Sequence, residues 1–162
     1  MSQKDPSILE KRAWLAPFSW EFIETINQIA CQNGGYLHKA SSDGFEETKS
    51  LWLQNQHKEM TFPETMDFLF SCHRKAPFCF LNGNTFVGIA RKITESVHLN
   101  AVNSHILRSI CGHIVAGTVK ADERERLFKM LNTEELSIKL RKPSSTILPS
   151  PPSPDRDRGP RI

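Results

Sequence analysis

The fold is decided at residues 72–91, which read CHRKAPFCFLNGNTFVGIAR. A polar helix end runs into a proline–phenylalanine turn, a short apolar strip follows, and the tight turn at 82–85 opens a second amphipathic helix. Proline disfavours the helical conformation in the residue before it, so the first helix must end before Pro77. The stretch therefore predicts two helices joined by a short irregular loop.

Capping residues mark the starts of the neighbouring helices. Ser19 is expected to cap a first helix, and Thr61 opens a capping box before the helix that ends at the loop. Asp43 begins a second capping box, which predicts a helix starting near that residue. The helix after the loop is expected to be capped by Asn82 or Asn84.

Apolar residues at helical spacing form stripes that we expect to face the core. In the first helix the stripe is Phe22, Ile23, Ile26, Ile29 and Ala30, and after the loop it is Phe86, Ile89, Ala90, Ile93 and Val97. Residues 101–119 carry a wider apolar arc, typical of a central helix with several neighbours. No segment has a persuasive strand pattern, although residues 78–81 suit a short extended piece. We therefore predict an all-α fold, a single-domain orthogonal bundle of roughly five to seven helices.

The chain divides into an N-terminal arm (1–17), a helical domain (18–141) and a Pro/Ser-rich tail (142–162). Its length of 162 residues suits one domain with a sizeable core. Residues 143–162 hold six of the ten prolines and no core-forming periodicity, which predicts a disordered tail. Polyproline II segments of this kind can dock in aromatic grooves of partner domains, and the alternative is a linker or a frayed end of the chain.

Composition disfavours several classes of protein. The net charge of +3, with basic residues scattered among acidic ones, is weak for a dedicated nucleic-acid-binding domain. No apolar run approaches the roughly 18 residues that span a bilayer, and the polar N-terminus lacks a signal-peptide core. We therefore expect a cytoplasmic protein without membrane contact, its four cysteines being free thiols.

The turn at 82–85 is the strongest candidate site. A glycine-containing turn that opens a helix leaves backbone N–H groups free to hold an anion. Basic residues flank the turn on both sides, and together they would form a positive rim suited to phosphate. The alternative is a structural turn between solvated helix faces, since Asn-Gly is a common tight-turn dipeptide. The candidate ligand-binding residues are Asn82, Gly83, Asn84, Thr85, Arg74, Lys75 and Arg91.

Residues 80–84 (FLNGN) resemble the middle of the loop motif of Fic and Doc proteins, which joins two helices of an all-helical domain. The resemblance implies nucleotide phosphates bound at the Gly-Asn turn and the helix N-terminus. Phe78 stands where the family has its catalytic histidine, while Thr85 and Phe86 stand where it has Gly or Lys and then Arg. Phenylalanine cannot take a proton, so a Fic-like chain is inactive unless His73 supplies the base.

Cysteine and histidine residues do not form a recognised metal motif. Cys72, His73 and Cys79 have the spacing C-H-x5-C, and Cys111 with His113 has the spacing C-x-H. Neither matches the usual zinc pairs, so we expect no metal and no cofactor. Cys72 and His73 point about 100° apart on a helix, so they do not form a catalytic dyad by themselves. His73 continues an apolar stripe, which predicts a half-buried, hydrogen-bonded histidine.

Three classes of function remain open. The first is a non-catalytic helical interaction or regulatory protein with a protein partner, because no complete catalytic constellation is present. The second is a Fic-like nucleotide- or phosphate-binding domain that uses the turn at 82–85. The third is a nucleic-acid-binding helical module, which rests only on the mild positive charge.

Overall fold

The computed structural model describes the backbone of residues 6–141 and the side chains up to residue 135. Over this range the chain forms six α-helices, which confirms the all-α prediction. The predicted tail at 142–162 lies outside the described residues. The helices are α1 (Trp20–Gly34), α2 (Phe45–Asn55), α3 (Phe62–Lys75), α4 (Asn82–Glu95), α5 (Ala101–Ala116) and α6 (Ala121–Arg141).

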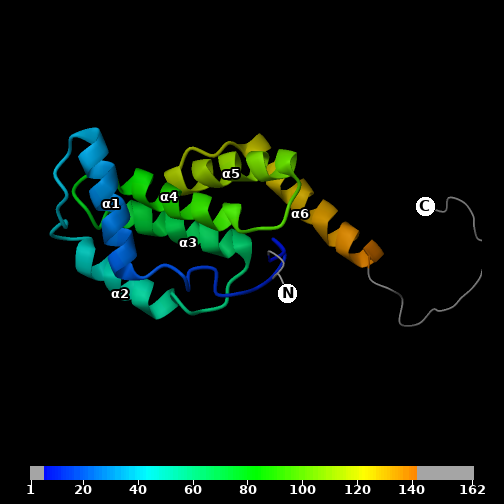
Figure 1. Ribbon diagram of the computed structural model, residues 1–162, viewed down its shortest axis with the longest axis horizontal. Helices are drawn as coiled ribbons and strands as arrows, with labels where there is room; N and C mark the ends of the chain where they lie inside the picture. Colours follow the sequence, from blue (N-terminus) through cyan, green and yellow to red (C-terminus); the bar gives the residue numbers. More distant parts are fainter. Residues whose placement is uncertain (1–5, 142–162) are drawn as a thin grey trace, which may run out of the picture.

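Three helices form the middle of the bundle. α4 packs against α1, α3 and α5, and α5 also packs against α3 and α6. Figure 1 shows α3, α4 and α5 side by side, with α1 crossing them steeply, as predicted for an orthogonal bundle. Within residues 6–141, α6 contacts α5 alone among the helices and projects away from the others (Figure 1). Within residues 6–141 the backbone forms no strand, only the isolated bridges Arg12–Met60 and Ala40–Phe78.

Two predicted helix caps are confirmed. The Ser19 hydroxyl accepts a hydrogen bond from the Phe22 N–H at 3.1 Å at the start of α1. Thr61 and Glu64 form both halves of a capping box at the start of α3. In each case a short sequence segment supplies both the free N–H group and its acceptor, so the local sequence is sufficient to position the helix start.

Two other predicted caps are wrong, and both failures involve the loop after α3. The residue before α2 is Gly44, which makes no side-chain cap; its N–H is bonded instead to the Ser41 hydroxyl at 3.1 Å. A Cβ atom at Gly44 would stand 2.0 Å from the Lys75 carbonyl oxygen, so close packing against the end of α3 requires glycine here.

At α4 the preceding residue is Leu81, in the left-handed region with φ of 61°, and the helix begins without a side-chain cap.

An aromatic core fills the space between the helices. Trp20 of α1 stacks on Phe78 of the loop, with ring centroids 6.1 Å apart, and Trp52 of α2 approaches Phe86 of α4 at 6.3 Å. These aromatic rings bury large apolar areas, so the loop after α3 belongs to the core. The predicted stripe after the loop is confirmed, since the following residues are all buried: Phe86, Ile89, Ala90, Ile93 and Val97.

The face that α1 presents to the core differs from the predicted stripe. Ile29 is 48% exposed, whereas the polar Asn27 is fully buried. The residues of α1 that are buried are Trp20, Ile23, Asn27 and Cys31. α1 is therefore rotated so that a buried amide, rather than part of its apolar stripe, faces the loop and α4.

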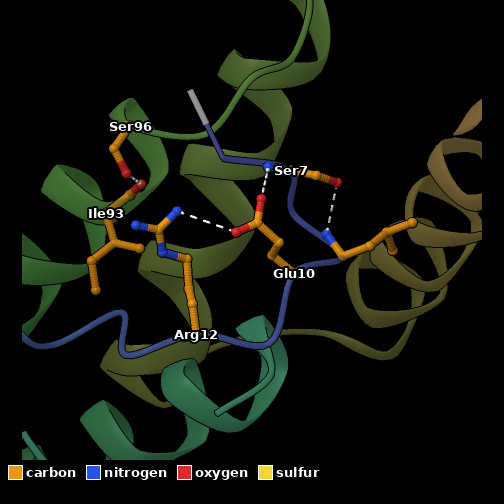
Figure 2. A network of polar contacts seen from close by, with 6 residues as sticks. Ser7, Glu10, Arg12, Ile93 and Ser96 are labelled. Carbon is orange, nitrogen blue, oxygen red and sulfur yellow. Dashed lines mark hydrogen bonds and ion pairs between the residues drawn. The ribbon is translucent and has the colours of Figure 1, made fainter. Parts of the chain in front are cut away.

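Residues 6–19 wrap around the bundle before α1 begins. The backbone of Arg12 pairs with Met60, and the Pro6 carbonyl accepts from the His98 N–H at 3.0 Å, so this segment reaches both the α2–α3 and the α4–α5 connections. Figure 2 shows the Glu10 carboxylate between Ser7 and Arg12, accepting from the Ser7 N–H and from Arg12 Nη1. The apolar residues of the segment that are buried are Ile8, Trp14 and Leu15. This part of the predicted arm therefore contributes to the core.

Across the described part of the chain, none of the helices combines the length and the apolar character that crossing a membrane requires.

Candidate functional site

The predicted site, the turn at 82–85, is tied into the loop that precedes it. The Asn82 amide accepts from the Phe78 N–H at 2.9 Å and donates to the Phe78 carbonyl at 2.7 Å. The Thr85 hydroxyl donates to the Leu81 carbonyl at 2.8 Å and is fully buried. Two of the three polar side chains in the turn, those of Asn82 and Thr85, are thus engaged within the loop itself.

A buried amide on α1 holds the same loop from the other side. Asn27 Nδ2 donates to the Phe80 carbonyl at 2.8 Å and to the Thr85 hydroxyl at 3.0 Å. His38 Nδ1 donates to Asn27 Oδ1 at 2.8 Å. All hydrogen-bonding groups of this buried amide have partners, as buried polar groups require. Asn27 therefore fixes the position of the loop relative to α1, a role that the sequence pattern did not indicate.

His73 is half-buried and hydrogen-bonded, as predicted, and it lies beside the turn. Its Nδ1 is 2.8 Å from the Val115 carbonyl oxygen, and because a carbonyl only accepts, Nδ1 carries the proton. A Cβ atom at Gly83 would stand 3.3 Å from His73 Nε2. The glycine therefore lets the start of α4 lie close against the imidazole ring.

The position that a Fic-like motif assigns to its catalytic histidine belongs to the core here. Phe78 is 2% exposed, and besides Trp20 its ring contacts Phe45, with centroids 6.0 Å apart. The side chain at this position is enclosed by aromatic rings and does not reach the solvent side of the turn. At this position of the loop, the side chain packs in the aromatic core and has no group that could transfer a proton.

The basic residues expected to surround the turn lie against different neighbours. Lys75 Nζ forms an ion pair with Glu47 of α2 at 2.7 Å, and the Arg74 guanidinium lies over the Phe70 ring at 5.9 Å. Arg91 is nine residues after Asn82 on α4, about 13 Å along the helix axis. Each of these three cations thus has its own surroundings, and Arg91 lines a pocket between α4 and α5.

Asn84, the remaining candidate, is exposed and lines a groove between α1 and α4. The groove has a volume of about 590 Å³. Tyr36 lines the groove, and its ring packs against that of Phe80, with ring centroids 5.2 Å apart and side chains 49% and 42% exposed. We call this the α1–α4 groove; its lining residues are Ile26, Ile29, Ala30, Asn33, Gly34, Tyr36, Leu81 and Asn84.

A second hollow lies along the seam between α4 and α5 and has a volume of about 460 Å³. We call it the α4–α5 pocket; its lining residues are Val87, Arg91, His105, Arg108, Ser109, Gly112, His113 and Ala116. The sequence analysis singled out Arg91 but not its neighbours on α5. The α5 side of the pocket could have been found from helical spacing. That spacing places four residues on one face of the helix: His105, Arg108, Ser109 and Gly112.

Buried thiols are poor candidates for chemistry. Burial raises the pKa of Cys72 to about 12 and also raises the pKa values of Cys31 and Cys111, which keeps these groups protonated. Cys79 is exposed. Through the described residues, no three His, Cys, Asp or Glu side chains lie close enough to hold a metal ion.

Two of the surface hollows in the described chain thus differ in their lining: the α1–α4 groove is lined mainly by apolar residues, and the α4–α5 pocket holds two arginines and two histidines. No match to this chain is found among protein-family models, curated proteins or solved structures.

Proposed function

We propose that this chain is a non-catalytic interaction protein that binds an apolar segment of a partner protein in the α1–α4 groove. The observation that carries the proposal is the exposure of Ile29 in a groove that is also lined by Tyr36, whose exposed ring packs against the exposed Phe80. Exposed apolar side chains gathered around a hollow are typical of protein interaction sites.

The groove has a rigid rim. The Phe80 carbonyl is held by the buried Asn27 amide, and the Tyr36 N–H donates to the Cys31 carbonyl at 2.8 Å. Tyrosine and phenylalanine offer large contact areas with few rotatable bonds. A rim that is ordered before binding loses little conformational entropy when a partner arrives, which favours affinity.

The polar residues of the groove define the chemistry of the partner. Asn33 and Asn84 are exposed, and their side chains make no hydrogen bonds to other residues of the described chain. Their amides are therefore available to a partner backbone, while Ile26, Ile29 and Leu81 accommodate an apolar side chain. The partner we expect is a peptide segment with one or two large apolar anchors and accessible backbone groups.

The four free cysteines support a reducing compartment, the cytoplasm, as the place of this interaction. The same proposal implies a regulatory role. A protein that binds a partner without catalysing a reaction exerts its effect by changing the activity or availability of that partner.

The test compares two apolar-to-acidic substitutions of the full chain. Ile29→Asp lies in the groove, and Leu53→Asp on α2 is the matched control, since its side chain is also exposed, at 57%. A photo-crosslinking residue at position 29 identifies the partner in cells that make this protein, and titration of the purified pair then gives the affinity. We expect Ile29→Asp to weaken binding by at least about tenfold and Leu53→Asp to leave it unchanged.

Equal weakening by both substitutions, or no weakening by Ile29→Asp, would contradict the groove as the binding surface. Circular dichroism of both variants checks that the helices are retained.

A further inference from the structure

We propose that the α4–α5 pocket binds the phosphate groups of a small phosphorylated metabolite. The pocket lies on a different pair of helix faces from the α1–α4 groove, and the two hollows share no lining residue. The proposal therefore stands independently of the interaction function described above.

The charge of the pocket is the first argument. Arg91 comes from α4 and Arg108 from α5, and His105 and His113 lie on the α5 side. No carboxylate is among the lining residues. Basic side chains gathered in the lining of one hollow favour an anion there, and the Arg91 guanidinium, which forms no ion pair among residues 6–135, contributes positive charge that no acidic side chain balances.

Acidic residues lie next to the pocket at both ends and not within its lining. Glu95 Oε2 is 3.6 Å from Arg108 Nη2, and Glu123 Oε2 is 2.5 Å from His113 Nδ1. The pKa of Glu123 is lowered, first by the Lys120 N–H and then by the hydrogen bond to His113, so this carboxylate is ionised at neutral pH. These contacts orient Arg108 and His113.

Arg91, in contrast, has no ion-pair partner among residues 6–135, so its guanidinium is available to a ligand.

The donor set matches phosphate. Guanidinium groups present parallel N–H donors that fit two oxygens of one phosphate, and they do so from both sides of the pocket. The exposed Ser109 hydroxyl and the His105 imidazole add further donors along the α5 side. All four donors lie on regular helices, which hold them at fixed spacing without a flexible loop.

The floor of the pocket is small and apolar. Gly112 has no side chain there, and a Cβ atom on it would meet Val87 Cγ1 at 3.6 Å. Ala116 continues the same surface. The volume of about 460 Å³ falls within the roughly 300–1,000 Å³ that small-molecule sites occupy. The pocket thus has room for an organic group as well as its phosphates, which favours a phosphorylated metabolite over a bare inorganic ion.

The experiment titrates the full chain with pyrophosphate and with adenosine triphosphate at constant ionic strength, following heat of binding and thermal stability. The variants are Arg91→Gln and Arg108→Gln, and the matched control is Arg126→Gln, an exposed arginine of α6 that makes the same change in net charge. We expect saturable binding that raises the melting temperature, weakened at least about tenfold by each pocket variant and unchanged by the control.

Three outcomes would overturn the proposal. The first is the absence of saturable binding to either phosphate compound, and the second is equal weakening by Arg126→Gln, which indicates non-specific charge attraction. The third is loss of binding in Asn84→Ala with Arg91→Gln unaffected, which would move the anion to the start of α4.

Parallel titrations with a short oligonucleotide and with anionic lipid vesicles extend the test. Tighter binding to either of them that depends on Arg91 would also overturn the proposal, because that partner and not a metabolite would then be the ligand of the pocket.

Discussion

The two halves of α4 differ in how their polar groups are used. At its start, Asn82 and Thr85 are bonded to the preceding loop, and Asn27 of α1 completes the network. In its second half, Arg91 faces α5 across a hollow and has no acidic partner in the described chain. The comparison shows that the fold itself can use polar groups of a turn rich in Asn and Gly, here Asn82 and Thr85, whereas the capacity to bind a ligand depends on polar groups left without internal partners.

The first prediction concerns the packing behind the loop and has the largest expected effect. Gly44→Ala places a Cβ atom 2.0 Å from the Lys75 carbonyl oxygen and 2.4 Å from that of Ala76, and neither backbone atom can move without displacing the loop. We expect a loss of about 3 kcal/mol in the free energy of unfolding, measured by urea denaturation. Gly88→Ala is the control, because its Cβ meets only Ile26 Cγ2 at 3.6 Å. This variant should be more stable by about 0.5–1 kcal/mol, and equal destabilisation by the two would contradict close packing at Gly44.

The second prediction tests whether the start of α4 is architectural. Asn27→Ala removes the amide that donates to the Phe80 carbonyl and the Thr85 hydroxyl and accepts from His38, so the part-buried Phe80 carbonyl and His38 Nδ1 lose these partners. We expect a loss of about 2 kcal/mol, since each buried unsatisfied group costs roughly 1–3 kcal/mol. Asn33→Ala on the same helix is exposed and should change stability by less than about 0.5 kcal/mol. Similar values for the two asparagines would show that the network does not stabilise the loop.

The third prediction contrasts the capped start of α3 with the uncapped start of α4. Thr61→Ala removes one half of the capping box and should lower the free energy of unfolding by about 1 kcal/mol. Leu81→Ala at the start of α4 removes no cap, because that helix has none.

The capping box also predicts a pH dependence. Hydrogen bonds from the Thr61 backbone and then its side chain lower the pKa of Glu64. A lowered folded-state pKa stabilises the protein at pH values above the unfolded pKa, and this contribution is lost as the pH falls through the folded pKa. Below about pH 4, wild type should therefore lose stability relative to Glu64→Gln. Parallel pH curves for the two proteins would contradict the assignment.

The smallest effect on stability is expected in the α4–α5 pocket. Arg91→Gln removes an exposed charge with no ion-pair partner in the described range, so the free energy of unfolding should change by less than about 0.5 kcal/mol. A loss comparable to that of Asn27→Ala would show that Arg91 has a structural role and would remove the contrast between the two halves of α4.

Several features of the fold were predictable because they depend on residues close together in the chain. Ser19 and Thr61 supply their own acceptors for the helix N–H groups beside them, and Pro77 ends α3 through its own ring. The stripe from Phe86 to Val97 repeats at helical spacing, so its burial followed from the sequence.

Other features were decided by packing between helices. The burial of Asn27 depends on carbonyl and hydroxyl groups more than fifty residues away, which no local pattern reveals. Its burial rotates α1 and leaves Ile29 on the surface, where it lines the α1–α4 groove. The four lining donors of the α4–α5 pocket come from two helices, which approach each other where Gly112 lies near Val87.

The sequence by itself thus determined where α1 and α3 begin, that α3 ends before Pro77 and which stripe of α4 is buried, because backbone hydrogen bonding and helical periodicity act over a few residues. Only the tertiary structure decided which polar groups are consumed by the fold and which remain available at the surface. The physical reason is that a hydrogen bond or an ion pair needs a partner at the right distance, and most of those partners belong to another helix.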